Sequence, residues 1–274
     1  MSNFSDFISS GGSASFPTIF LHKSQTWVPP QDGNIMIHVI GAGGSGSGSH
    51  TTLTNIQSGA AGGYCRKNSL AVTTSGSFTV VVGAGGAARI GNHGAGTAGG
   101  TTTVAGTGLS ATLTATGGAG GAFVNGFTAG GVGSNGNLNT TGGRGGIYIG
   151  GGAVGLTGTG KDGSNGGVYT DTRGGDCDIL GDFYSSSLGQ ISGGSGGNMV
   201  SHNRYSTTGY VGLLALADPL AGGGSSYLEN AVNFLRGSDA VIGGGGGWFY
   251  GNQANTSIWS GRGGEGCVVI QYIP

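Results

Sequence analysis

The sequence has few charged residues and few prolines, and these shortages exclude several classes of protein. Charged residues make up 8% of the 274 residues, and the net charge is −1. Binding to nucleic-acid phosphates needs a basic patch, which is absent, so we expect no nucleic-acid partner. Five prolines and an irregular glycine spacing exclude a collagen triple helix. No run reaches the roughly 18 consecutive apolar residues of a membrane helix, so no membrane insertion is expected.

Side chains that perform catalysis or hold metals are also scarce. No Asp or Glu occurs between Asp32 and Asp162, which excludes most carboxylate-based active sites from that stretch. Cys65, Cys177 and Cys267 form no Cys-x-x-Cys pair, and this spacing indicates free thiols or small core residues. The five histidines lack metal-ligand spacing. With no nucleophile and base to pair, we expect the chain not to be an enzyme.

Two motifs are typical of ligand sites, but their surroundings do not support them. Gly41-Ala-Gly-Gly-Ser-Gly46 matches the dinucleotide fingerprint, yet no helix-forming residues follow it and no acid stands about 20 residues later. We therefore expect no cofactor. Asp171, Asp176, Asp178 and Asp182 offer oxygen ligands for calcium. Their order does not match an EF-hand loop, which favours a solvated acidic loop and no metal.

Short runs of branched and aromatic residues that end at glycine predict the fold class. Such runs indicate strands at 34–40, 77–82 and 266–273, with weaker strands at 70–74 and 111–116. The glycine boundaries and short spacing favour an all-β antiparallel sandwich with almost no helix. One short helix is indicated over 227–236, where Gly237 would stop it.

Glycine contributes 68 of the 274 residues, mostly in clusters after the predicted strands. Ordering so much glycine costs backbone entropy. Extended left-handed helices with three residues per turn, the polyglycine II form, offer compensation, because rods without side chains pack closely and exchange backbone hydrogen bonds. Val39-Ile-Gly-Ala-Gly-Gly44 and Val81-Val-Gly-Ala-Gly-Gly86 place such segments directly after strands. We predict strands that run into packed glycine segments with long loops; a set of loose glycine loops is the alternative.

Several blocks along the chain resemble the glycine-rich domain of bacteriophage tail fibres. Thr26-Trp-Val-Pro-Pro30 followed by 33–44 looks like the opening of that domain, and 77–86 is similar to its second strand and glycine turn. Gly263-Gly-Glu-Gly-Cys-Val-Val-Ile-Gln-Tyr272 resembles its closing strand. The resemblance implies a virion protein of the tail fibre or tail tip, made in the host cytoplasm and commonly a homotrimer. It also implies an adhesin that binds a host surface glycan or an outer-membrane protein.

The predicted receptor-binding residues lie in the aromatic-rich segments of the second half. Tyr and Trp give a large contact area with few torsions to order, and a rigid scaffold lowers the entropic cost of binding. For each aromatic residue, a place in the domain's own core is the alternative. The predicted residues are Tyr184, Tyr205, Tyr210, Trp248, Phe249, Tyr250 and Trp259.

The chain divides into an arm and a domain. We predict a virion-attachment arm and linker at 1–25 and one glycine-rich β domain at 26–274, with surface loops in 169–260. Phe4, Phe7 and Ile8 are expected to dock the arm onto other virion tail proteins, the alternative being a ragged terminus. The alternative function is a purely structural virion component, such as a head fibre, decoration protein or tail connector.

Overall fold

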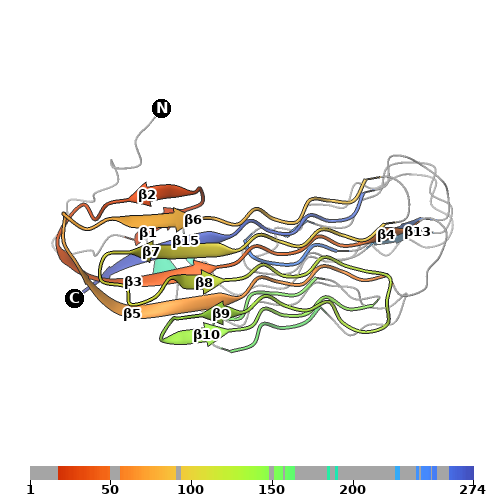
Figure 1. Ribbon diagram of the computed structural model, residues 1–274. Helices are drawn as coiled ribbons and strands as arrows, with labels where there is room; N and C mark the ends of the chain where they lie inside the picture. The colour runs from red at the N-terminus through yellow and green to blue at the C-terminus, as the bar shows by residue number, and fades with distance from the viewer. Residues whose placement is uncertain are drawn as a thin grey trace.

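The computed structural model is all-β, with no helix among the residues it describes. The longer strands gather at one end of the molecule, extended glycine-rich segments run side by side from them, and β4 and β13 lie at the opposite end (Figure 1). The predicted fold class, an antiparallel sandwich whose strands continue into packed glycine segments, is confirmed. No described segment is a helix of the length and apolar character that a membrane crossing needs. The described residues are 18–49, 56–90, 94–147, 151–156, 158–163, 184–185, 189–190, 226–228, 239–240, 242–247, 249–251 and 259–274.

Two five-stranded antiparallel sheets form the sandwich. The first has the order β1-β15-β3-β5-β10, and the second has the order β2-β6-β7-β8-β9. The consecutive strands β1 and β2 belong to opposite sheets, as do β9 and β10, so the chain crosses between the sheets at both edges. The first sheet comprises β1 (Thr18–Leu21), β15 (Cys267–Ile273), β3 (Gly33–Ile40), β5 (Tyr64–Val72) and β10 (Leu138–Thr140). The second comprises β2 (Gln25–Trp27), β6 (Phe78–Val81), β7 (Thr102–Gly106), β8 (Leu113–Ala115) and β9 (Gly133–Ser134).

Two smaller sheets hold the remaining strands. β14 (Phe249–Gly251) lies between β13 (Ser226–Leu228) and β4 (Gly48–Ser49), and it is parallel to both. β11 (Tyr184–Ser185) pairs only with β12 (Gly189–Gln190). The helix predicted over 227–236 is wrong at its start, because Tyr227 pairs with Tyr250 of β14 and its backbone is extended. Residues 229–236 lie outside the described residues.

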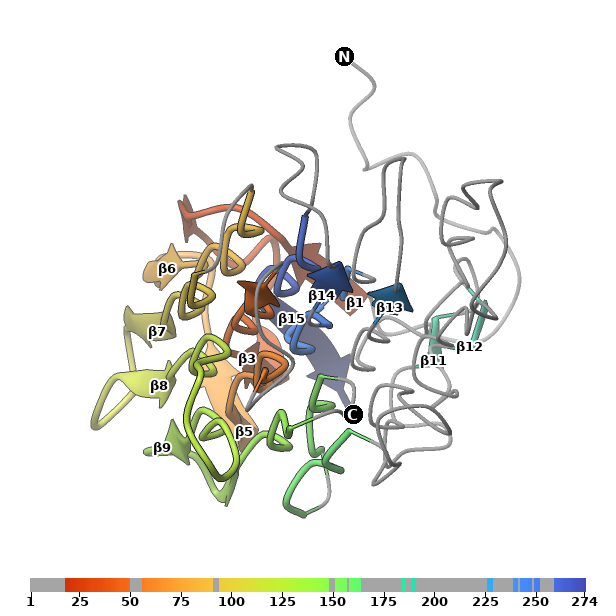
Figure 2. The ribbon, with the colours of Figure 1, turned by 90° about the vertical axis from the view of Figure 1, so that its right-hand side faces the viewer.

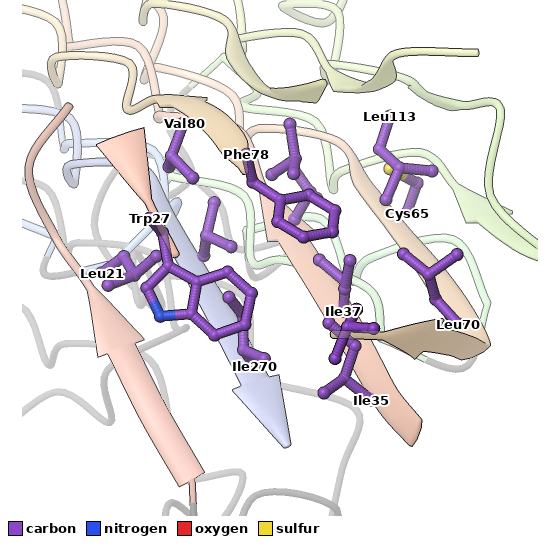
Figure 3. Close-up of a cluster of buried hydrophobic side chains, with 14 of the residues drawn as sticks. Leu21, Trp27, Ile35, Ile37, Cys65, Leu70, Phe78, Val80, Leu113 and Ile270 are labelled. Atoms are coloured by element: carbon purple, nitrogen blue, oxygen red, sulfur yellow. The ribbon is translucent and has the colours of Figure 1, made fainter. Parts of the chain in front are cut away.

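The main core lies between the two sheets. Ile35, Ile37 and Val39 alternate along β3 and point towards the second sheet, as the predicted strand pattern requires (Figure 3). Phe78 of β6 is fully buried and packs against Trp27, with ring centroids 5.4 Å apart. Burial of one such side chain stabilises the fold by roughly 1.5–3 kcal/mol.

The opposite face of the first sheet is also covered. Ile40, Tyr64 and Val269 pack there with Val154 and Leu156, which come from the segment 151–156. His38 is buried on this face. Its Nδ1 lies 2.7 Å from the Tyr64 hydroxyl, and its Nε2 lies 3.0 Å from Oε1 of Gln271. The histidine is therefore a hydrogen-bonded member of the sheet.

The sandwich takes in part of the predicted arm. β1 pairs along its length with β15, from Thr18 opposite Gln271 to Leu21 opposite Val268. Leu21 is buried in the main core. The folded unit therefore begins before residue 26. The rest of the predicted arm, 1–17 with Phe4, Phe7 and Ile8, lies outside the described residues.

The glycine-rich segments form rods with three residues per turn. In the segment 41–48, which continues β3, every third N–H group donates to the same neighbouring rod, with N···O distances of 2.8–3.1 Å. This repeat is the geometry of polyglycine II. Gly41, Gly44 and Ser47 donate to 57–63, Ala42, Ser45 and Gly48 donate to 94–100, and Gly43 and Gly46 donate to 261–264.

Two rods are fully enclosed by others (Figure 2 looks along them). Adjacent members of each surrounding ring are also hydrogen-bonded to each other, as in Gly263 N–H to Gly86 O and Gly100 N–H to Ala84 O. Backbone polar groups are thus satisfied without a conventional sheet. Rod 41–48 is surrounded by 56–63, 94–101, 83–90, 259–266, 242–247 and 116–122, and rod 56–63 by 41–48, 116–122, 128–132, 141–147, 151–156 and 242–247.

Close approach, and not unusual torsion angles, is what requires glycine inside the rods. A Cβ atom on Gly43 would lie 1.8 Å from the carbonyl oxygen of Gly244, and one on Gly59 would lie 2.0 Å from that of Gly44. Neither glycine has a positive φ. A side chain at either position would push two rods apart.

Rods at the surface show a Gly-Gly-X pattern. In Gly142-Gly143-Arg144-Gly145-Gly146 the glycines are buried between rods and Arg144 is exposed. The segment 260–266 has the same period, with Arg262 and Glu265 exposed. The overall glycine spacing is irregular, but in these two surface rods the third residue of each repeat is free to carry a side chain.

Candidate binding surface at the distal ends of the rods

The rods bring many chain connections to one end of the molecule. Rods 41–48, 83–90 and 116–122 leave the sandwich after β3, β6 and β8, while 56–63 and 94–101 return to β5 and β7. The links between leaving and returning rods therefore lie at the end remote from the sandwich, here called the distal end (Figure 1). Lateral hydrogen bonds hold the rods in place, so the distal end is a natural place for a binding surface.

A buried glutamine fixes one distal turn. The turn 123–127 joins rod 116–122 to rod 128–132. Nε2 of Gln57 donates to the carbonyl oxygens of Val124 and Gly126 at 2.7 and 2.9 Å, and its Oε1 accepts from the N–H of Ala122 at 3.1 Å. Gln57 is 2% exposed, and its three bonds to the turn are partly buried. One side chain thus sets the shape of the whole turn.

This turn presents apolar side chains to solvent. Phe127 is 48% exposed and Val124 is 59% exposed. The Arg144 guanidinium lies over the Phe127 ring, 4.1 Å from its centroid, and forms a 2.7 Å salt bridge with Asp162. The hydrogen bonds that the Arg144 guanidinium donates to Asp162, and then the charge of Asp162, raise the pKa of Arg144 above its ordinary value. The two charges are paired with each other, so the exposed ring lies on a fixed and electrically balanced support.

A second exposed apolar side chain lies where rods 83–90 and 259–266 end. Ile90 is 55% exposed and forms an antiparallel bridge with Trp259. The N–H of Ser260 donates to the carbonyl oxygen of Arg89 at 3.0 Å, and the N–H of Arg89 donates to Oγ of Ser260 at 2.9 Å. The half-buried Trp259 is therefore held at the distal end by pairing with the end of rod 83–90.

Three of the predicted receptor-binding residues come together at this end. Phe249 and Tyr250 of β14 pair with Gly48 and Ser49, at the tip of the enclosed rod 41–48, and Trp259 lies on a neighbouring rod. Tyr184 belongs to the β11–β12 hairpin, which Figure 2 shows well apart from β13 and β14. Tyr205, Tyr210 and Trp248 lie outside the described residues.

The described residues contain no group of three or more His, Cys, Asp and Glu side chains that could hold a metal ion. The acidic residues Asp171–Asp182 lie outside the described residues. Cys65 and Cys267 are free thiols buried in the sandwich, as their spacing indicated.

Sequence reasoning missed Phe127, Val124 and Ile90. Each is a large apolar residue at the end of a glycine rod, outside the aromatic-rich segments from which the binding residues were predicted. The available signal was the break in the Gly-Gly-X pattern at the point where a rod ends. That signal becomes readable only once the rods and their period of three are recognised.

Comparison with known proteins identifies one family. Residues 21–273 match the family described as a glycine-rich domain. The match begins within β1 and ends within β15, so it covers the sandwich and all the rods. No curated protein matches the sequence.

Proposed function

The chain belongs to the glycine-rich domain family, and we propose that it is a bacteriophage tail-fibre or tail-tip protein that binds the host cell surface. The observation that supports this function is the bundle of laterally bonded rods, which ends in exposed Ile90, Val124 and Phe127. The blocks that resemble tail-fibre domains lie within the strands and rods that build this scaffold. In this proposal the protein is part of the virion and is not an enzyme.

Binding uses the distal surface as a whole. Phe127 on its Arg144 support offers a flat ring whose order has already been established by folding. Phe249, Tyr250 and Trp259 add aromatic residues at the same end of the bundle. A surface ordered before binding loses less entropy on contact, and aromatic anchors supply most of the energy at such interfaces. The partner is a host surface glycan or an outer-membrane protein, and several copies on one virion raise weak contacts to firm attachment.

Residues 1–17, which precede β1, are proposed to attach the protein to other virion tail proteins through Phe4, Phe7 and Ile8. β1 lies at an edge of the first sheet, at the sandwich end of the molecule (Figure 1). An arm that leaves from this end would hold the sandwich towards the virion and point the rods towards the host.

The test is adsorption of the purified full chain to intact cells from a panel of bacterial strains. We expect saturable binding to one or more strains, and a roughly tenfold loss of affinity for Phe127→Ala, the size typical of an interface anchor. The matched control is Val28→Ala, because Val28 is 52% exposed but lies between β2 and β3, at the sandwich end. Equal binding by both variants would count against the distal surface as the binding site. A virion that incorporates the protein while the protein binds no cell would favour the structural alternative.

A further inference from the structure

The outer rods carry side chains only where no neighbouring rod approaches. Rods 83–90 and 94–101 lie side by side, joined by the N–H of Gly100 and the carbonyl oxygen of Ala84. Among their described residues every glycine is buried or half-buried, and every exposed position has a side chain. Ala87, Ala95 and Ala98 are exposed and take no part in the backbone hydrogen bonds between described rods. Glycines are likewise buried or half-buried, and exposed positions have side chains, among the described residues of 116–122, 128–132, 141–147 and 259–266.

A glycine-only rod surface binds another rod. Inside the molecule, wherever two glycine faces meet, the rods approach until an added Cβ atom would lie within about 2 Å of the facing carbonyl, as at Gly83 against Gly100 and Gly85 against Gly263. Backbone N–H and C=O groups then pair across the contact. An outer rod without side chains would present this same surface to solvent.

We propose that the face of rods 83–90 and 94–101 is a latent interaction surface for a second copy of this chain, and that its exposed side chains keep that surface closed. The partner is a second copy because the backbone of one rod offers the hydrogen-bond donors and acceptors that another rod needs. Every N–H of rod 41–48 that bonds to 57–63, 94–100 or 261–264 bonds to a rod running in the opposite direction. A two-fold axis across the rods places the same face of a second copy antiparallel to the first, which is the arrangement those bonds need.

Charge does not keep two such faces apart. Arg89 is the only charged residue in 83–90 and 94–101, and it stands at the distal end. Separation therefore depends on the side chains of Ala84, Ala87, Ala95, Thr97 and Ala98, whose Cβ atoms hold a facing backbone beyond hydrogen-bonding reach. Any residue in place of glycine also lowers the entropy of the unfolded chain. Keeping a second copy at a distance is a separate role of these side chains.

The test compares two five-fold variants of the full chain by sedimentation velocity over a range of concentrations. The glycine variant carries A84G, A87G, A95G, T97G and A98G. The serine variant carries serine at the same five positions, which keeps every Cβ atom and adds a polar group. We expect the serine variant to sediment like the wild type, and the glycine variant to shift with concentration towards twice the wild-type mass or more.

Circular dichroism and hydrogen exchange of rod 41–48 establish that each variant is folded. A folded glycine variant that keeps the wild-type mass at all concentrations would overturn the proposal and leave only the entropic role for these residues. Association of the serine variant to the same extent would also overturn it. If the five-fold glycine variant does not fold, the pair A84G and A87G replaces it, with weaker but measurable self-association expected and the wild-type mass as the contrary result.

Discussion

Replacing Gly59 by alanine should destabilise the protein more than an ordinary surface substitution, because Gly59 lies in the enclosed rod 56–63. The new Cβ atom would lie 2.0 Å from the carbonyl oxygen of Gly44 and 2.5 Å from its carbonyl carbon. Real Cβ atoms essentially never approach closer than 3.0 Å, so the rods must separate locally by 3.0 − 2.0 Å, which is about 1 Å. Neither side of the contact is a flexible side chain that could move away.

The size of the effect follows from the hydrogen bonds that cross this contact. Gly44 N–H donates to Ala60 O at 2.9 Å, and Ser47 N–H donates to Gln57 O at 3.0 Å. A separation of about 1 Å takes both beyond hydrogen-bond length, and each buried group left without a partner costs roughly 1–3 kcal/mol. Alanine in place of glycine also lowers the entropy of the unfolded chain, which stabilises the folded state by about 0.4–1 kcal/mol. The net loss is about 3 kcal/mol, or roughly 10 °C in Tm for a domain of this size.

Chemical denaturation and thermal unfolding of Gly59→Ala beside the wild type measure this loss. Two glycines provide matched controls. Among the described residues, a Cβ atom on Gly48 would meet only Cγ of Arg89, at 3.9 Å, and one on Gly158 would meet nothing within 4 Å. Both alanine variants should equal or slightly exceed the wild type in stability. If Gly59→Ala unfolds within about 0.5 kcal/mol of the controls, the rods do not approach as described and the reasoning fails.

Two further predictions concern buried polar groups. Gln57→Ala should release the turn 123–127, because it removes three hydrogen bonds; faster amide exchange of Ala122, with slow exchange kept at Ala42, checks this, and unchanged exchange at Ala122 would contradict it. Burial raises the pKa of Cys65 from 9.0 to about 11 and that of Cys267 from 9.0 to about 12. Both thiols should therefore resist alkylation at pH 8 until the protein is denatured, as peptide mass spectrometry would show. Because the folded state holds these protons more tightly, the free energy of unfolding should fall as pH rises above 9, and alkaline stability that stays constant to pH 11 would contradict the burial.

The sandwich could be predicted wherever side chains decide the structure. The strands at 34–40, 77–82 and 266–273 were predicted because runs of branched residues border glycine there, and these runs form β3, β6 and β15. The weaker prediction at 70–74 caught only the end of β5, whose first part contains Arg66, Lys67 and Asn68. That part is a strand because β3 and β10 pair with it on both sides. Backbone pairing of this kind leaves little trace in hydropathy.

The packing of the rods could be predicted only in general terms. Packed polyglycine was predicted because hydrogen bonds between rods can compensate for the backbone entropy lost when so much glycine is ordered. The neighbours of each rod were not predicted. Which rod accepts from Ser45 or Ser47 depends on the positions of chain segments far away in the sequence. Of the predicted receptor-binding residues, Phe249, Tyr250 and Trp259 lie at the distal end. Phe127 was missed because its exposure depends on Gln57 and Arg144, both remote from it along the chain.

The ring around rod 41–48 has a consequence for the order of folding. Gly43 and Gly46 bond to Gly264 and Gly261, more than two hundred residues later, and β3 pairs with β15. A nascent polypeptide that has emerged only as far as rod 242–247 therefore has an open ring and an unfinished first sheet. Contacts this distant in sequence are costly to close and make folding slow. The ring and the first sheet can therefore close only after residues 259–273 have been synthesised.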